Sequence, residues 1–197
     1  MMWIHKWATC IAVVMVMVSS GASRAEAQVV SFTSITDAVA TRFFNPATSR
    51  PAVGNANKLV IGLHNTFDST ALKWTNFRAS TAAFSYTTAA DTISFTIKAP
   101  TGFYVAKITY AQTGSGSVVR TGKVAGAATW VVAGRAMNLG TFSTNGALSR
   151  TVDISAKKLT SVPVSITDTL FAFATPSLGS ATLTLTGASV SVYLLPK

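Results

Sequence analysis

Apolar and polar residues alternate, position by position, through most of the chain from residue 58 onward. In residues 92–98, Ile93, Phe95 and Ile97 alternate with threonine, serine and lysine, and residues 182–186 alternate threonine with leucine. A period of two is the spacing of side chains on one face of a β-strand, so each run places one face on a core and the other in solvent. No stretch offers the repeated crossover helices that a parallel α/β fold needs. The pattern therefore predicts antiparallel strands.

The number and spacing of these runs indicate the fold class. About ten short strands, separated by Gly, Pro, Asn and Asp, are typical of an all-β fold, either an antiparallel two-sheet β-sandwich or a jelly roll. The strongest hairpin signal is the TGSGS segment at residues 113–117, because its glycines suit a tight turn. It predicts that residues 104–113 pair with residues 117–123. A length of 197 residues fits one such domain.

The segment before residue 58 departs from the alternation. In residues 34–44, Ile35, Val39 and Phe43 are four apart and follow Ser, Thr and Asp, which fits a short helix, although an edge strand fits equally. Residues 45–55 have the composition of a loop. We therefore expect an N-terminal extension and loop over residues 28–57, with one helix at most, and the β-sandwich domain over residues 58–197.

The first 27 residues have the three parts of a secretory signal peptide. A short basic segment precedes residues 7–18, which are apolar except for one threonine, and a small, polar stretch ends in Ala25-Glu26-Ala27. A membrane span needs about 20 apolar residues, more than this run has. We expect cleavage after residue 27 and a secreted or periplasmic product that has no transmembrane segment after signal removal. Cys10 would leave with the peptide, so the mature chain would contain no disulfide.

The residues that carry chemistry are few. Beyond residue 27 the chain has one histidine, His64, and neither cysteine nor glutamate. This excludes a Cys/His dyad and a metal site of several histidines. The Gly-x-Ser-x-Gly motif of a nucleophilic serine is also missing there. We therefore predict no catalytic residue, no metal site and no cofactor, and a protein that is not an enzyme.

An Asp-dependent hydrolase remains an alternative, because folding can bring two aspartates to the separation that glycoside hydrolysis requires. Sequence context assigns Asp37 to a helix start, Asp68 and Asp91 to turns, Asp168 to a loop and Asp153 to the wet face of a strand. These five are the carboxylate side chains of the chain after residue 27. No motif groups them.

The charge of the chain is strongly positive. Removal of residues 1–27 takes Lys6, Arg24 and Glu26 with it and leaves fourteen basic and five acidic residues. The basic residues are scattered, and Lys157 and Lys158 form the one adjacent pair. A field of this sign favours polyanions, while the lack of a recognition motif argues against specific nucleic-acid binding. We expect an anionic polysaccharide or envelope surface as partner, with Lys157 and Lys158 as candidate ligand-binding residues.

Aromatic side chains offer a second kind of binding surface, because they can stack on sugar rings. Trp74 and Trp130 have apolar neighbours of strand parity, which favours a place in the core, and Trp74 is kept as a binding candidate. Tyr104 and Tyr110 share strand parity, which fits either a buried face or a binding stripe. Tyr104 and Tyr110 are therefore also candidate ligand-binding residues, and Tyr193 is a third tyrosine suited to a partly exposed face.

These observations favour a secreted, non-catalytic β-sandwich that serves as a structural or adhesive component of a cell envelope, matrix or appendage. Its affinity for anionic surfaces would be driven by charge, and self-assembly is left open. The first alternative is a carbohydrate-binding module that uses exposed aromatics. The second is the Asp-dependent hydrolase.

Overall fold

The computed structural model describes residues 29–38, 43–64, 66–68, 73–75, 78–82, 85–120, 122–174 and 179–197. For residues 66–68, 73–75, 78–80, 82 and 85 it describes the backbone alone. The predicted signal peptide, residues 1–27, lies outside the described residues. Within them, no helix has both the length and the apolar character needed to cross a membrane.

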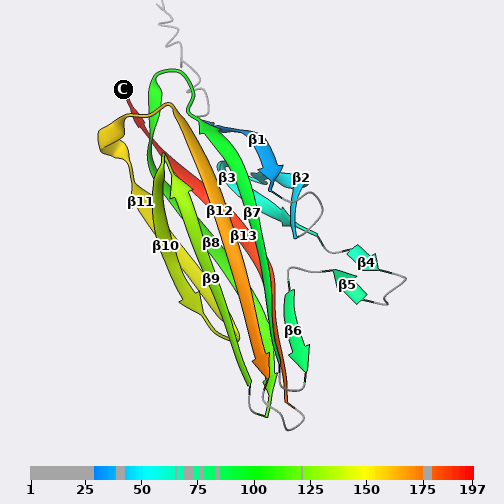
Figure 1. Ribbon diagram of the computed structural model, residues 1–197. Coiled ribbons are helices and arrows are strands. Elements are labelled where there is room, and N and C mark those ends of the chain that lie inside the picture. The colour runs from blue at the N-terminus through cyan, green and yellow to red at the C-terminus, as the bar shows by residue number, and fades with distance from the viewer. Residues whose placement is uncertain are drawn as a thin grey trace, which may run out of the picture.

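Two antiparallel sheets pack face to face (Figure 1). Sheet 1 has the strand order β1 (Ser31–Asp37), β7 (Ser85–Lys98), β12 (Ser161–Ala174), β9 (Gly122–Val132) and β10 (Arg135–Phe142). Sheet 2 has the order β11 (Gly146–Asp153), β8 (Phe103–Val119), β13 (Ser180–Pro196), β3 (Asn55–Leu63) and β2 (Phe44–Ala52), and β6 (Arg78–Ala82) also pairs with β13. The strands β4 (Thr66–Asp68) and β5 (Lys73–Thr75) pair separately, and η1 (Ser155–Lys157) is a short 3-10 helix. The all-β, two-sheet sandwich predicted from the sequence is confirmed.

The core lies between the two sheets and is built from the alternating runs. Ile93, Phe95 and Ile97 of β7 are buried, as are Leu183 and Leu185 of β13, while the threonines and serines between them point outward. Complete burial of such a side chain contributes about 1.5–3 kcal/mol relative to leaving it exposed. The period of two therefore selected the correct inward face in both sheets.

The predicted hairpin at residues 113–117 is wrong. These residues lie inside β8, which pairs with β13 on one side and with β11 on the other. Gly114 in this segment has a packing role: the ring of Phe142 lies against Gly114, Gly126 and Gly146, and a Cβ at any of the three would collide with the Phe142 side chain. Glycines on three strands thus leave room for one large side chain. In the sequence alone, a glycine in this segment looks like a turn residue.

The N-terminal segment also differs from expectation. Residues 31–37 form β1, the edge strand of sheet 1. Where the segment 34–44 is described, it therefore contains an edge strand rather than a helix, and residues 39–42 lie outside the described residues. The loop predicted over residues 45–55 is wrong, because β2 pairs there with β3. As the edge strand of sheet 2, β2 tolerates Pro46 and Pro51, which cannot donate a backbone hydrogen bond. Both strands belong to the sheets of the sandwich.

Candidate ligand-binding surfaces

The two tyrosines proposed from the sequence are buried. Tyr110 has no exposed surface and Tyr104 has 9%. They also lie on different faces of β8, because the register with β13 shifts between Tyr193 and Leu194 and Ala106 is an extra residue in β8. The shared parity of Tyr104 and Tyr110 is therefore not preserved. Neither ring is available to stack on a ligand.

The two tryptophans considered above differ in what the structure shows of them. Trp130 is a core residue, as expected, and its ring centroid lies 6.3 Å from that of Tyr110. Its Nε1 is buried without a hydrogen-bond partner among the described residues. Trp74 lies on β5 opposite Phe67 of β4, and its side chain is outside the described part of the structure.

Lys157 and Lys158 are exposed at one end of the sandwich, in and just after η1. Two other lysines reach the same end. Lys98 is the last residue of β7 and pairs with Ser161 of β12. The backbone N–H of Lys197 donates to the carbonyl of Gly102 in the β7–β8 loop. Figure 1 shows the C-terminus, this loop and the end of β11 together. We call Lys98, Lys157, Lys158 and Lys197 the basic end.

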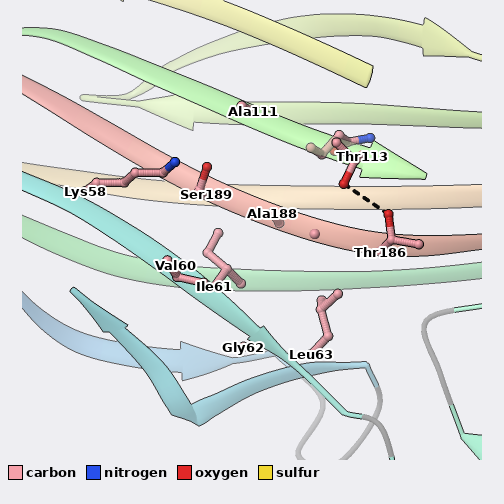
Figure 2. Close-up of a pocket in the computed structure, with 12 residues that line it drawn as sticks. Lys58, Val60, Ile61, Gly62, Leu63, Ala111, Thr113, Thr186, Ala188 and Ser189 are labelled. Carbon is pink, nitrogen blue, oxygen red and sulfur yellow. Dashed lines mark hydrogen bonds between the residues drawn. The ribbon is translucent and has the colours of Figure 1, made fainter. Parts of the chain in front are cut away.

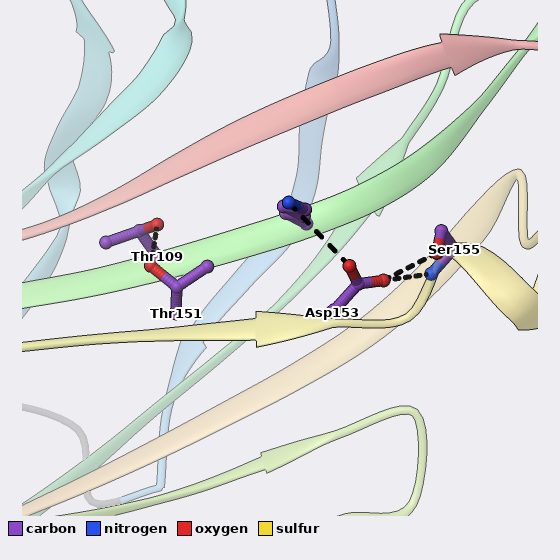
Figure 3. A network of polar contacts seen from close by, with 5 residues as sticks. Thr109, Thr151, Asp153 and Ser155 are labelled. Atoms are coloured by element: carbon purple, nitrogen blue, oxygen red, sulfur yellow. Dashed lines mark hydrogen bonds and ion pairs between the residues drawn. The ribbon is translucent and has the colours of Figure 1, made fainter.

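Asp153 lies beside the basic end and takes part in the network of polar contacts in Figure 3. One oxygen accepts hydrogen bonds from the backbone N–H (2.9 Å) and the hydroxyl (2.6 Å) of Ser155, and the other lies 3.8 Å from Lys107 Nζ. The Ser155 hydrogen bonds, followed by the charge of Lys107, lower the pKa of Asp153. Nearby, Thr109 and Thr151 join β8 to β11 through their hydroxyls at 2.7 Å. Asp153 is on the wet face of its strand, as predicted, and it joins β8, β11 and η1.

Two aspartates are inside the core, contrary to the sequence assignments. Asp91, predicted in a turn, and Asp168, predicted in a loop, are directly opposite each other on β7 and β12 and are 4% and 0% exposed. Each occupies an inward position of its strand, in step with Ile93 and Ile166. That parity was readable in the sequence. Local sequence context alone does not show the burial, and carboxylates are rarely buried without partners.

Both carboxylates find their partners across the core. Asp91 accepts backbone hydrogen bonds of 2.9 Å from Phe43 and Phe44, at the start of β2. Asp168 accepts a 2.6 Å hydrogen bond from the Tyr110 hydroxyl. With the Gln112 side-chain amide oriented so that its nitrogen faces the carboxylate, that nitrogen donates to both Asp168 oxygens (2.5 and 3.2 Å). Burial raises the pKa of Asp168 to about 7, against the opposing effect of the Tyr110 hydrogen bond. The aspartates that folding brings together thus connect the two sheets rather than line a cleft.

An aromatic cluster that the sequence analysis missed lies on the outer face of sheet 1. Tyr86 is 70% exposed and stacks on Phe171, with ring centroids 6.2 Å apart and ring planes inclined by 26°. Phe173, half-buried, lies directly between Tyr86 of β7 and Lys123 of β9. We call Tyr86, Phe171 and Phe173 the aromatic surface. Extending the inward parity of Val164 and Ile166 along β12 would have found it, because that parity turns both phenylalanines outward.

A shallow hollow adjoins the aromatic surface. It measures about 420 Å³ and is lined by Phe171, Lys123, Ser143 and Thr144 among others. It forms because β10 pairs with β9 only as far as Gly126, so the first residues of β9 extend beyond their neighbour on that side. Aromatic, cationic and hydroxyl groups therefore meet at this end of sheet 1.

The rest of the outer face of sheet 1 carries hydroxyl groups. Thr92 and Thr167 are hydrogen-bonded to each other at 2.7 Å, and Ser94 donates to Ser165 at 3.0 Å. Along β7, β12 and β9 the charged residues of this outer face are Lys98 at one end and Lys123 at the other. A polar but uncharged surface thus continues from the aromatic surface.

A groove of about 570 Å³ opens in sheet 2 (Figure 2). It lies where strand pairing is interrupted: β3 pairs with β13 up to Ala188 and β6 pairs up to Thr184, so no described strand pairs with residues 185–187 on that side. Figure 2 shows Lys58 and Ser189 in one part of the groove and Thr113 and Thr186 in another. The Thr186 hydroxyl donates to that of Thr113 at 3.0 Å.

Within the described residues, no three or more His, Cys, Asp or Glu side chains come together in an arrangement that could hold a metal ion.

Comparison with known proteins gives likenesses of shape alone. No protein-family model and no curated protein matches the chain. A similar solved structure is that of TmCBM61 in complex with β-1,4-galactotriose, at 11% identity and a TM-score of 0.31, covering 87% of this chain and 90% of that one. Another is the enzymatically active domain of bacteriophage CBA120 tailspike protein 4, at 9% identity and a TM-score of 0.28, covering 84% of this chain and 19% of that one. At these values neither alignment transfers a residue or a ligand.

Proposed function

We propose that this protein is an exported, non-catalytic adhesion protein that binds polysaccharide through the aromatic surface of sheet 1. The observation that carries the proposal is Tyr86, a tyrosine 70% exposed on a sheet face and stacked on Phe171. Clustered apolar groups left in solvent mark interaction sites in soluble proteins. Pyranose rings present apolar C–H faces that pack on aromatic rings, while their hydroxyls need polar partners.

The surroundings supply those polar partners. Lys123, Ser143 and Thr144 line the hollow next to Phe171, and the Thr92–Thr167 pair lies further along the same face. Since the face is uncharged between Lys98 and Lys123, an extended neutral chain could lie along it without burying an unpaired charge. This arrangement favours an extended polysaccharide over a compact small molecule.

The placement of the carboxylates supports a role without catalysis. Asp91 and Asp168 are enclosed in the core, and Asp153 is bound by Ser155 and Lys107. None of these three lies beside the aromatic surface. A pair of carboxylates flanking a bound sugar, which hydrolysis requires, is not formed by them.

A binding panel with matched variants tests the proposal. The purified protein is mixed with insoluble cellulose, chitin and xylan at 0.1 and 1 M NaCl, beside Tyr86→Ala and the control Tyr193→Ala. Tyr193 is also exposed (57%) but lies on sheet 2. We expect salt-resistant binding to at least one neutral polysaccharide, weakened at least tenfold by Tyr86→Ala and within twofold of wild type for Tyr193→Ala. Absence of binding, or equal loss in both variants, contradicts the proposal.

The basic end supports a second candidate function, charge-driven attachment to anionic surfaces. Four lysines lie at that end, and of the described aspartates the one nearby in the fold, Asp153, is already paired with Lys107. Such attraction weakens as the Debye length falls from about 10 Å at 0.1 M salt to about 3 Å at 1 M. Salt therefore separates the two candidates: stacking survives it, whereas charge attraction does not.

A further inference from the structure

The groove in sheet 2 has the composition of a second binding site. Its volume of about 570 Å³ lies within the range of about 300–1,000 Å³ that is typical of ligand pockets. Small residues line part of it, among them Gly62, Ala111, Gly187 and Ala188. The side chains that border it include one lysine, three hydroxyl residues and the apolar Val60 and Leu63.

We propose that this groove binds an acidic sugar, a uronic acid unit within an anionic polysaccharide. Lys58 would pair with the carboxylate, the hydroxyls of Ser189, Thr113 and Thr186 would bind the sugar hydroxyls, and Val60 and Leu63 would contact the apolar face of the ring.

The charge of the groove selects an anion. Lys58 is the one charged residue that lines it. Among the described side chains, no carboxylate forms an ion pair with Lys58. Because the lysine is half-buried beside apolar groups, its attraction for a ligand carboxylate is screened less than at a fully exposed site.

The hydroxyls of the groove complement a sugar. Thr186 donates to Thr113, which leaves the Thr113 hydroxyl free to donate its own proton and Thr186 free to accept. Ser189 adds a third hydroxyl beside Lys58. A sugar hydroxyl both donates and accepts, so it can use each of these positions.

The base of the groove is fixed before any ligand binds. Gln112 lines it with only 1% of its surface exposed, and its amide nitrogen is held by Asp168 and Tyr110 from beneath. The gap in pairing along β13 lies between two paired segments, β3 and β6. A preorganised site of this kind loses little conformational entropy on binding.

Trigalacturonate tests this site, with its fully methyl-esterified form as the uncharged probe. Binding is measured by calorimetry for wild type, Lys58→Ala and the matched control Lys107→Ala, which removes the same charge from the outer face of the same sheet. We expect Lys58→Ala and methyl esterification each to weaken binding at least tenfold, and Lys107→Ala to remain within twofold. No binding, equal loss in the two lysine variants, or undiminished binding of the ester overturns the proposal.

Two further variants separate the groove from folding defects and from the aromatic surface. Thr186→Val keeps the shape of the side chain and removes its hydroxyl, and Thr184→Val makes the same change on β13 outside the groove. We expect a loss of threefold or more only for Thr186→Val, with both variants unfolding cooperatively like wild type. Tyr86→Ala should leave trigalacturonate binding unchanged, because it lies on the other sheet; a loss there would place the acidic sugar on sheet 1 and refute the groove.

Discussion

Asp168 makes the stability of this protein depend on pH in an unusual direction. Its pKa rises from an ordinary value of 3.8 to about 7, because burial disfavours the charged carboxylate. Between about pH 4 and pH 7, therefore, Asp168 is protonated in the folded state and ionised in the unfolded state. It follows that the contribution of this group is fully present below pH 4 and is lost as pH rises through 7. Most carboxylates that folding affects behave in the opposite way.

The size of the effect follows from the shift. About three pKa units at 1.36 kcal/mol each correspond to about 4 kcal/mol of unfolding free energy between pH 4 and pH 8. Asp168→Asn keeps the size of the side chain and removes the titration. Relative to wild type, the variant should therefore gain up to about 4 kcal/mol over this interval. The pKa of Tyr110 is raised further above 10 by burial and by Asp168, so the tyrosine stays protonated throughout.

Urea unfolding of both proteins at half-unit steps from pH 4 to pH 8 measures this difference. Asp153→Asn is the control: the pKa of Asp153 is lowered, so the exposed carboxylate is ionised in both states above about pH 5 and adds no slope there. Parallel stability curves for wild type and Asp168→Asn would refute the reasoning. They would mean that the Tyr110 and Gln112 hydrogen bonds offset the cost of burying the charge.

Three other changes have defined outcomes. Gly126→Ala should lower the unfolding free energy by about 1–3 kcal/mol in urea, because a methyl group there displaces the ring of Phe142; unchanged stability would show that the ring has room to move. Tyr110→Phe should cost about 1–3 kcal/mol near pH 8, by removing a donor to Asp168, while binding of neutral polysaccharide to the aromatic surface stays within twofold of wild type. Replacing Lys157 and Lys158 with alanine should reduce binding to anionic polysaccharide at 0.1 M salt and have little effect at 1 M; a salt-independent loss would indicate a shaped site instead.

The sequence predicted the sheets because a period of two needs no knowledge of partners. It failed where a residue's role depends on distant strands. Gly114 resembles a turn residue until Phe142, from another strand, is placed against it. Pro51 resembles a loop residue until β2 is known to be an edge strand.

The binding surfaces likewise include features that the local pattern predicts and features that depend on distant strands. Lys157 and Lys158 are exposed, as expected, but an added residue in β8 placed Tyr104 and Tyr110 on different faces, and neither is exposed. Nothing in the sequence around Ala106 indicates that this residue forms a bulge. The groove depends on where β3 and β6 stop pairing with β13, which is a property of the assembled sheet. The aromatic surface, in contrast, was within reach, since strand parity alone turns Phe171 and Phe173 outward.

Polysaccharide binding by the aromatic surface is tested most directly by mapping the contact residue by residue. The ¹³C,¹⁵N-labelled protein is titrated at 1 M NaCl with hexaoses of cellulose, chitin and xylan, and amide and aromatic chemical shifts are followed. At least one hexaose should produce saturable shifts concentrated at Tyr86, Phe171, Phe173 and Lys123, with none at Tyr193. Saturable shifts elsewhere on the protein, or no shifts with any hexaose, would contradict the account.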